Sequence, residues 1–234
     1  MDQIHEFVDR RQKAWCIQCG RSISALETNA DHVPSKTLLQ KPYPANLPVV
    51  GTCIDCNNAF SADEEYLFLF LQCVLAGTTD PSRQTDSRVA RALLRHEKLR
   101  TRIEASRNEE TIHSETRSVW YPEPERVNRV ILKNARGHAF YELGEPMLDA
   151  PAHIWAAPLE TMTSVERAEF EAYHADGLWP EVGSRMLTRI VTGQNLDNGW
   201  VELQEGVYRY SVAQQGLVRS ALYEYLATEV LWTD

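Results

Sequence analysis

The chain has 234 residues, of which 43% are hydrophobic and 24% charged, so it can bury a core and does not read as disordered or collagen-like. The net charge of -9 argues against a protein that coats nucleic acid over its whole surface. The N-terminus lacks a basic start followed by an apolar run, so we expect no signal peptide. The longest strongly apolar stretch, residues 66–71, is too short to span a bilayer, and we expect a cytoplasmic protein with no membrane partner.

The charge is unevenly distributed along the chain. Residues 1–80 carry 6 Lys and Arg against 10 Asp and Glu, residues 81–140 carry 13 against 8, and residues 141–234 carry 5 against 15. Any surface that faces phosphate is therefore expected to draw on the middle segment. A solvated, arginine-rich helix explains the same segment equally well.

The N-terminal third contains two predicted helices separated by a long loop. Apolar residues at helical spacing predict a helix over residues 2–13. The segment 15–52 is rich in proline and reads as loop with short β pieces. Ser61 and Glu64 fit a capping box, which predicts a helix from Ser61 to about residue 76, with Gly77 as its stop.

The rest of the chain reads as a mixture of helices and strands, which predicts the α+β class. Helices are predicted over residues 84–106, 125–136 and 164–173, with Gly137 ending the second of them. Strands are predicted over residues 118–121, 154–157, 207–210 and 221–232. We expect a small module in residues 1–80, followed by a larger α+β accessory or recognition region in residues 81–234.

Four of the five cysteines form two C-x-x-C pairs, Cys16 with Cys19 and Cys53 with Cys56. Each pair places two thiolates on a tight turn at a spacing that suits adjacent corners of a tetrahedron. Together they predict a structural Zn²⁺ site with no open position for catalysis. The alternatives are four unrelated buried thiols or a redox pair. Cys73 stands apart in an apolar run and is expected in the core.

The two cysteine pairs bracket Asp31 and His32, which point to opposite sides if this segment is extended. One could hold a divalent cation while the other holds a water molecule. Hydrolysis of a phosphodiester needs both roles, because a cation neutralises charge on the phosphate and a base takes a proton from the attacking water. A carboxylate is a hard ligand for Mg²⁺, and a neutral imidazole is a base near neutral pH.

The chain resembles the zinc-stapled HNH endonucleases, which have the ββα-metal fold, over roughly residues 14–66. The resemblance rests on four elements in order: Cys16-x-x-Cys19, Asp31-His32-Val33-Pro34, Asn46-Leu47 and Cys53-x-x-Cys56-Asn57. By position, it implies that Asp31 and Asn57 hold a catalytic Mg²⁺ or Mn²⁺, that His32 is the general base and that Asn46 positions this histidine. It implies a hydrolase that cuts nucleic acid, with DNA as the favoured substrate.

Two features depart from the family pattern. No Lys or Arg stands close behind Asn57, and the acidic residues Asp63, Glu64 and Glu65 follow instead. These carboxylates are either further cation ligands or the negative side chains that a helix N-terminus favours, and we prefer the second interpretation. The gap between Asn46 and the second cysteine pair is also longer than in short members of the family.

Three of the predicted site residues, Asp31, His32 and Asn57, also have a purely structural interpretation. Asp31 could cap a turn, His32 could support the zinc ligands, and Asn57 could cap the following helix. Finding all of these by accident, in this order and inside a four-cysteine cluster, is less expected than finding one of them.

Three functions therefore compete. The first is an active nuclease, and the second is a catalytically inactive, zinc-stapled binding module that acts through a protein partner. The third is a nuclease that works as the effector of a multi-protein system such as phage defence, where a partner supplies the grip on nucleic acid. Residues 81–234 carry no motif with attached chemistry, and their expected roles are substrate choice, partner docking or homo-oligomer formation.

Overall fold

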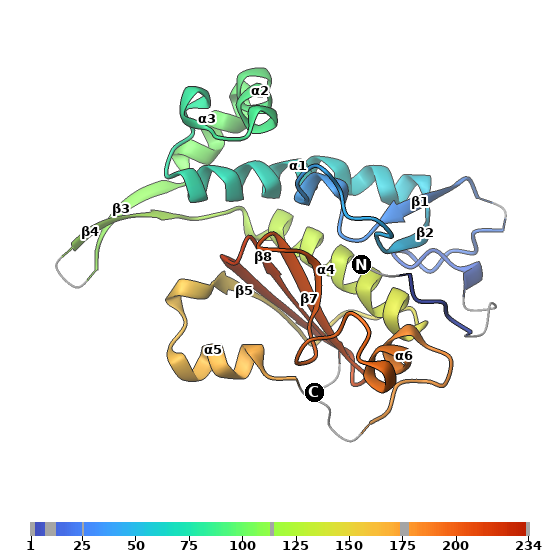
Figure 1. Ribbon diagram of the computed structural model, residues 1–234. Coiled ribbons are helices and arrows are strands. Elements are labelled where there is room, and N and C mark those ends of the chain that lie inside the picture. Colours follow the sequence, from blue (N-terminus) through green and yellow to red (C-terminus); the bar gives the residue numbers. More distant parts are fainter. Residues whose placement is uncertain (1–2, 8–12, 25, 113–114, 174–177, 233–234) are drawn as a thin grey trace. The chain divides into compact units, whose positions relative to one another are not determined.

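A computed structural model describes residues 3–7, 13–24, 26–112, 115–173 and 178–232 (Figure 1). Its helices are α1 (Ile54–Ala76), α2 (Ser87–Arg95), α3 (Glu97–Ala105), α4 (Pro124–Leu143), α5 (Ser164–Glu171) and α6 (Arg185–Thr192). Its strands are β1 (Thr28–His32), β2 (Val49–Cys53), β3 (Arg107–Ile112), β4 (Glu115–Trp120), β5 (His153–Pro158), β6 (Val201–Gln204), β7 (Tyr208–Ala213), β8 (Leu217–Leu222) and β9 (Leu226–Leu231). Helices and separate antiparallel sheets confirm the α+β class.

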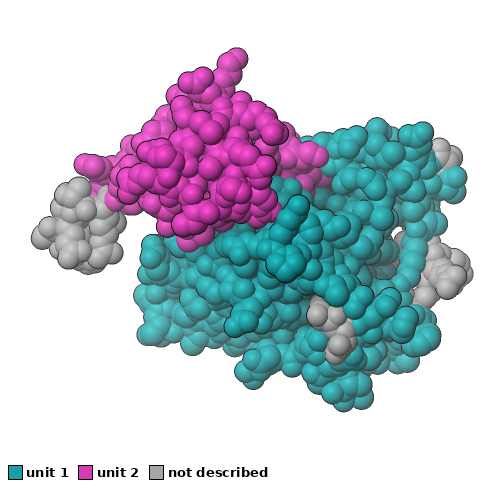
Figure 2. Space-filling view, turned by 45° about the horizontal axis from the view of Figure 1, so that its top comes forward, with its two compact units in different colours: residues 1–59, 131–234 teal, residues 60–130 magenta. Residues whose placement is uncertain are grey.

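The chain divides into two compact units, which Figure 2 shows in different colours. The first unit joins residues 1–59 to residues 131–234, and the second consists of residues 60–130. Helices α1 and α4 each contribute to both units. The expected boundary between a module and a C-terminal region, at residues 80 and 81, falls inside the second unit and at neither of its ends. A division of the chain by function at that point stays a prediction. No helix in the described part of the chain is long and apolar enough to cross a membrane.

In the first unit, β1 and β2 form an antiparallel hairpin and α1 follows β2 directly, which gives the order β-β-α. The helix begins at Ile54, where the backbone N–H donates to the Glu27 carbonyl at 3.1 Å. The predicted start at Ser61 is wrong, because the second cysteine pair itself forms the entry into the helix. Glu64 therefore lies inside α1 and is buried there. The predicted end at residue 76 is confirmed, with Gly77 at a positive φ of 64°.

The same unit contains a five-stranded antiparallel sheet in the order β5-β9-β8-β7-β6. The C-terminal part of α4 covers one face, where the ring of His138 stacks on Tyr210 of β7 with 3.8 Å between centroids. Helix α5 covers the other face, where Phe170 packs with Trp200 and Ala221. The sheet thus lies between two helices, as Figure 1 shows.

A buried ion pair fastens α6 to α4 in this unit. Arg189 donates to both carboxylate oxygens of Glu142 at 2.9 Å, and neither side chain has exposed surface. The hydroxyl of Tyr210 donates to the same carboxylate at 2.6 Å. Because a buried charge is tolerated only when it is paired and hydrogen-bonded, this cluster fixes α4 relative to the sheet.

The second unit holds the acidic residues that follow the second cysteine pair. Asp63 lies within α1 and pairs with Arg126 at 2.6 Å and Arg129 at 3.0 Å, both from α4. The interpretation of this acidic group as a helix N-terminus is wrong, because α1 starts nine residues earlier, at Ile54. Its pairing with arginines accounts for Asp63 without a metal ion.

Several predicted elements differ from the observed ones. Residues 3–7 are not helical: the Ile4 carbonyl accepts a hydrogen bond from the Arg185 guanidinium, and the Phe7 N–H donates to the Gly183 carbonyl. Residue 2 and residues 8–12 of that predicted helix lie outside the described residues. The predicted helix 84–106 is two helices, because the backbone of His96 leaves the helical region at φ -107° and ψ 61°.

The remaining strand predictions fall on β4, β5 and β7 and on the hairpin of β8 and β9. The single strand predicted over 221–232 is wrong, because Tyr223 and Glu224 adopt positive φ and turn the chain between β8 and β9. The predicted helix 164–173 is α5. Among the described α-helices and strands, β3, β6 and α6 were not predicted, and the prediction reached only the last two residues of β8.

Candidate metal centre and nuclease site

The first cysteine pair lies on a tight turn. The N–H of Gly20 donates to the Cys16 carbonyl at 2.8 Å, and the N–H of Cys16 donates to the Arg21 carbonyl at 2.9 Å. Gly20 has a φ of 69°, a conformation that costs glycine little and other residues more. The turn therefore places Cys16 and Cys19 side by side, as their spacing predicts.

The second cysteine pair spans the junction of β2 and α1, with Cys53 ending the strand and Cys56 in the first turn of the helix. The four Sγ atoms all lie within 4.8 Å of one another, and the Cys19 and Cys53 sulfurs are 3.9 Å apart. Zn–S bonds of about 2.3 Å in a tetrahedron place the sulfurs about 3.8 Å apart. The four cysteines therefore form a cluster that can hold a zinc ion.

Hydrogen bonds to the sulfurs support a set of thiolates. The backbone N–H of Cys53 donates to the Cys16 sulfur at 3.4 Å. The guanidinium of Arg21 donates to the Cys19 and Cys53 sulfurs, each at 3.4 Å, and to Asp55 at 3.1 Å. A cation at this position offsets the negative charge of a four-thiolate site.

The thiol pKa values differ with the surroundings of each sulfur. Burial opposes ionisation of Cys19, but the hydrogen bonds from Arg21, together with those from the other cysteines, outweigh it and lower the pKa of Cys19 to about 6. Burial raises the pKa values of Cys16 and Cys56. Burial also raises the pKa of Cys73 to about 12, in agreement with its predicted place in the core.

Asp31 lies in β1 opposite Val50, and its side chain is buried. The Nζ of Lys133 lies 3.1 Å from its Oδ1 and 3.0 Å from its Oδ2. Lys133 is also buried, with 2% of its side chain exposed. The structure thus joins the predicted cation ligand to a lysine that is 102 residues away in the sequence.

His32 ends β1 opposite Val49 and is half-buried. Burial lowers the pKa of His32, and the positive charges of Lys36 and Lys133 lower it further. The imidazole is therefore neutral at pH 7, which is the form that a general base requires.

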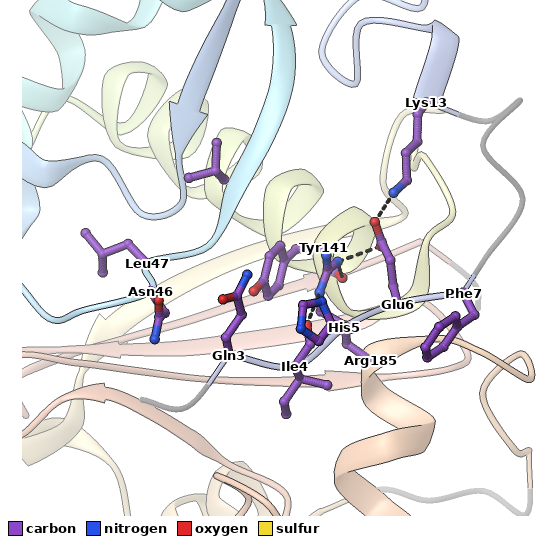
Figure 3. A pocket seen from close by; sticks show the side chains of 11 residues that line it. Gln3, Ile4, His5, Glu6, Phe7, Lys13, Asn46, Leu47, Tyr141 and Arg185 are labelled. Atoms are coloured by element: carbon purple, nitrogen blue, oxygen red, sulfur yellow. Dashed lines mark hydrogen bonds and ion pairs between the residues drawn. The ribbon is translucent and has the colours of Figure 1, made fainter.

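The two predicted asparagines lie in different surroundings. Asn57 follows Cys56 directly in the first turns of α1 and is half-buried. Asn46 is exposed in the loop before β2, at a φ of 58°. It lines a cavity of 690 Å³ together with Val49, Tyr141, Arg185 and the N-terminal segment 3–7 (Figure 3). The predicted roles of both asparagines at the site stay predictions.

The C-terminal part of α4 packs against the turn of the first cysteine pair and against Val33, which follows β1. The Lys133 carbonyl accepts a hydrogen bond from Gln18 at 3.3 Å, and Arg136 donates to the Gln18 carbonyl at 3.1 Å. At Gly137 a Cβ atom would lie only 2.5 Å from the side chain of Val33. Gly137 therefore permits close packing inside α4, and the prediction that it ends the helix is wrong.

Sequence reasoning missed two residues of this region. Arg21 had a usable signal, because a cation directly after a C-x-x-C-Gly turn is placed to meet the thiolates. Lys133 had no local signal, since it lies in an ordinary helical pattern and only the tertiary fold brings it to Asp31.

No family model, curated protein or solved structure matches this chain. The resemblance to the HNH endonucleases therefore stays a prediction that rests on the motifs quoted above.

Proposed function

We propose that this protein is a metal-dependent HNH-type endonuclease that hydrolyses phosphodiester bonds of nucleic acid, with DNA as the favoured substrate. The observation that carries the proposal is the β-β-α order of β1, β2 and α1, closed by the four-cysteine cluster. Asp31 and His32 lie at the end of β1, and Asn57 lies in the first turns of α1. The proposal gives these residues the roles that the motif resemblance implies.

In this proposal the residues have separate tasks. The neutral imidazole of His32 takes a proton from the attacking water, and the oxygens of Asp31 and Asn57 hold the cation. A bound Mg²⁺ or Mn²⁺ supplies the charge that stabilises the phosphate and the departing oxygen. The four cysteines do no chemistry and fix the hairpin to the start of α1.

The basic middle segment is the proposed contact for the nucleic-acid backbone. Helices α2 and α3 of the second unit expose Arg91, Arg95 and Lys98. Exposed cations of this kind bind phosphate without sequence preference and make binding sensitive to salt.

The test is cleavage of plasmid DNA and of a labelled RNA by the zinc-loaded full chain, with Mg²⁺ or Mn²⁺ added after dialysis. His32→Ala is expected to reduce cleavage by about two orders of magnitude or more, since general-base catalysis contributes that much. His153→Ala, which changes an exposed histidine on β5, is the matched control and should keep full activity. Equal cleavage by wild type and His32→Ala refutes the mechanism.

A second candidate is the inactive binding module that acts through a protein partner. The observation in its favour is the buried pair of Lys133 with Asp31, because an ammonium group already balances the carboxylate charge. Absence of cleavage together with absence of Asp31-dependent Mn²⁺ binding favours this module. Silence of the isolated protein, followed by His32-dependent cleavage once a partner is added, supports the third proposal of a defence effector.

A further inference from the structure

The cavity of 690 Å³ adjoins the face of the hairpin that carries His32 (Figure 3). All of its lining residues belong to the first unit. Val49 is one of them, and it lies directly opposite His32 in the pairing of β1 with β2. Directly opposite residues of an antiparallel pair project from the same face, with Cβ atoms about 5 Å apart. The cavity therefore begins next to the proposed general base.

Two cations share one carboxylate at the wall of this cavity. Glu6 forms ion pairs with both Arg185 and Lys13, which Figure 3 marks with dashed lines. Burial and the positive charge of Arg185 lower the pKa of Lys13, so the two cations are close enough to repel each other. Among the described residues that line the cavity, no other side chain is charged while histidine is neutral. The lining thus has a net charge of +1, although the whole chain carries -9.

The guanidinium of Arg185 is held in place by contacts besides the one to Glu6. Its Nε donates to the Ile4 carbonyl at 3.1 Å, and its Nη1 donates to the Tyr141 carbonyl at 2.7 Å. The group lies over the Tyr141 ring, 4.0 Å from the centroid. Its Nη2 makes no hydrogen bond to a described residue and is left as a donor for a ligand. A donor that is fixed in advance loses little conformational entropy when an anion binds.

The chemistry of the lining suits a nucleotide. A guanidinium fork fits the oxygens of a carboxylate and of a phosphate alike, so Glu6 occupies the position that a phosphate would take. Around it, Ile4, Leu47 and Val49 offer apolar surface, and Gln3 offers an amide. This mixture matches a sugar and a base, and the volume lies in the range of about 300–1,000 Å³ that small-molecule sites have.

We propose that this cavity binds a nucleotide unit of the strand that the nuclease site cuts, with its phosphate on Arg185 and Lys13 in place of the Glu6 carboxylate. This inference rests on the proposed function, in which the strand lies against His32. Glu6 is then a competitor within the same chain, and it must leave the two cations before the phosphate reaches them. Such an intramolecular competitor lowers the apparent affinity for the strand.

The experiment measures binding of a fluorescein-labelled single-stranded DNA oligonucleotide by anisotropy, on the zinc-loaded full chain without added Mg²⁺ or Mn²⁺. Glu6→Gln should bind about fivefold or more tightly, because the competing charge is gone, and Lys13→Met about fivefold or more weakly. Lys13→Met should also lower the salt slope of binding by about 0.7, the value for one phosphate contact on a single strand. A purely structural Glu6 would not produce tighter binding.

The matched controls are Glu205→Gln and Lys41→Met. Both residues are exposed, belong to the first unit and lie outside the cavity, and the changes alter the net charge by the same amounts. Their affinities should stay within about twofold of wild type, since an exposed charge contributes little. Zinc content and thermal unfolding verify the fold of every variant.

A titration with thymidine monophosphate identifies the source of the phosphate. A strand ligand requires the oligonucleotide to bind more tightly than the mononucleotide, and both affinities to rise in Glu6→Gln. Equal affinities assign the cavity to a free nucleotide and overturn the proposal.

The remaining outcomes separate this inference from the proposed function. If Glu6→Gln and Lys13→Met bind the oligonucleotide as their controls do, while His32-dependent cleavage is intact, the inference alone is overturned. Absence of both oligonucleotide binding and His32-dependent cleavage overturns the two together. Tighter binding by Glu6→Gln without any His32-dependent cleavage supports the cavity as a nucleotide site and overturns the catalytic proposal.

Discussion

His138 lies on α4 and has no exposed surface. Its Nε2 is 3.0 Å from the hydroxyl of Tyr208, and burial lowers the pKa of His138 to about 3. In the unfolded chain the same ring has an ordinary pKa near 6.5. Between these two values the unfolded chain binds a proton that the folded chain does not bind. The free energy of unfolding therefore falls as the pH falls from about 6.5 toward 3.

The size of the effect follows from proton linkage. One proton changes the free energy of unfolding by about 1.4 kcal/mol for each pH unit inside this window. Between pH 7 and pH 5, His138 is expected to remove about 2 kcal/mol, because the ring in the unfolded chain becomes almost fully charged over that interval. The expected loss depends mainly on the unfolded pKa, since the folded pKa lies well below pH 5.

The assay compares urea unfolding of wild type and His138→Phe at pH 7, 6 and 5, followed by circular dichroism with zinc in excess. Phenylalanine keeps a ring to stack on Tyr210 and cannot take a proton. Protonation of other groups, including the thiols, cancels in the difference between the two proteins. Wild type should lose about 2 kcal/mol more than the variant from pH 7 to pH 5. Equal losses in both proteins refute a buried, neutral His138.

Two further predictions concern the cysteine cluster and the packing of α4. Cys16→Ser should lower bound zinc well below one ion per chain and reduce the free energy of unfolding by several kcal/mol, whereas the control Cys73→Ser should keep the zinc. Metal analysis and thermal unfolding measure both effects. Full zinc content in Cys16→Ser would contradict the site. Gly137→Ala should lose about 1–3 kcal/mol although alanine favours helix, because its Cβ would overlap Val33. Denaturation of the single variants and of the double variant with Val33→Ala measures this. The second change should restore part of the loss, and independent, additive effects would contradict the overlap.

The sequence by itself determined features that depend on nearby residues. The paired C-x-x-C spacing predicted the four-cysteine cluster, because ligand spacing within a turn is a local property. Gly77 marked the end of α1 for the same reason, since a positive φ favours glycine. The order Cys16, Asp31, Asn57 also carries the nuclease proposal, whose site roles stay predictions.

The tertiary structure decided what depends on distant residues. The start of α1 at Ile54 follows from the cysteine cluster and from the contact with Glu27, which local capping rules do not contain. The sequence pattern placed Gly137 at a helix end, yet it lies inside α4, where the missing Cβ leaves room for the side chain of Val33. The pairing of Lys133 with Asp31 joins residues 102 positions apart. Periodicity records which face of a helix is buried, but only the folded chain shows which groups meet on that face.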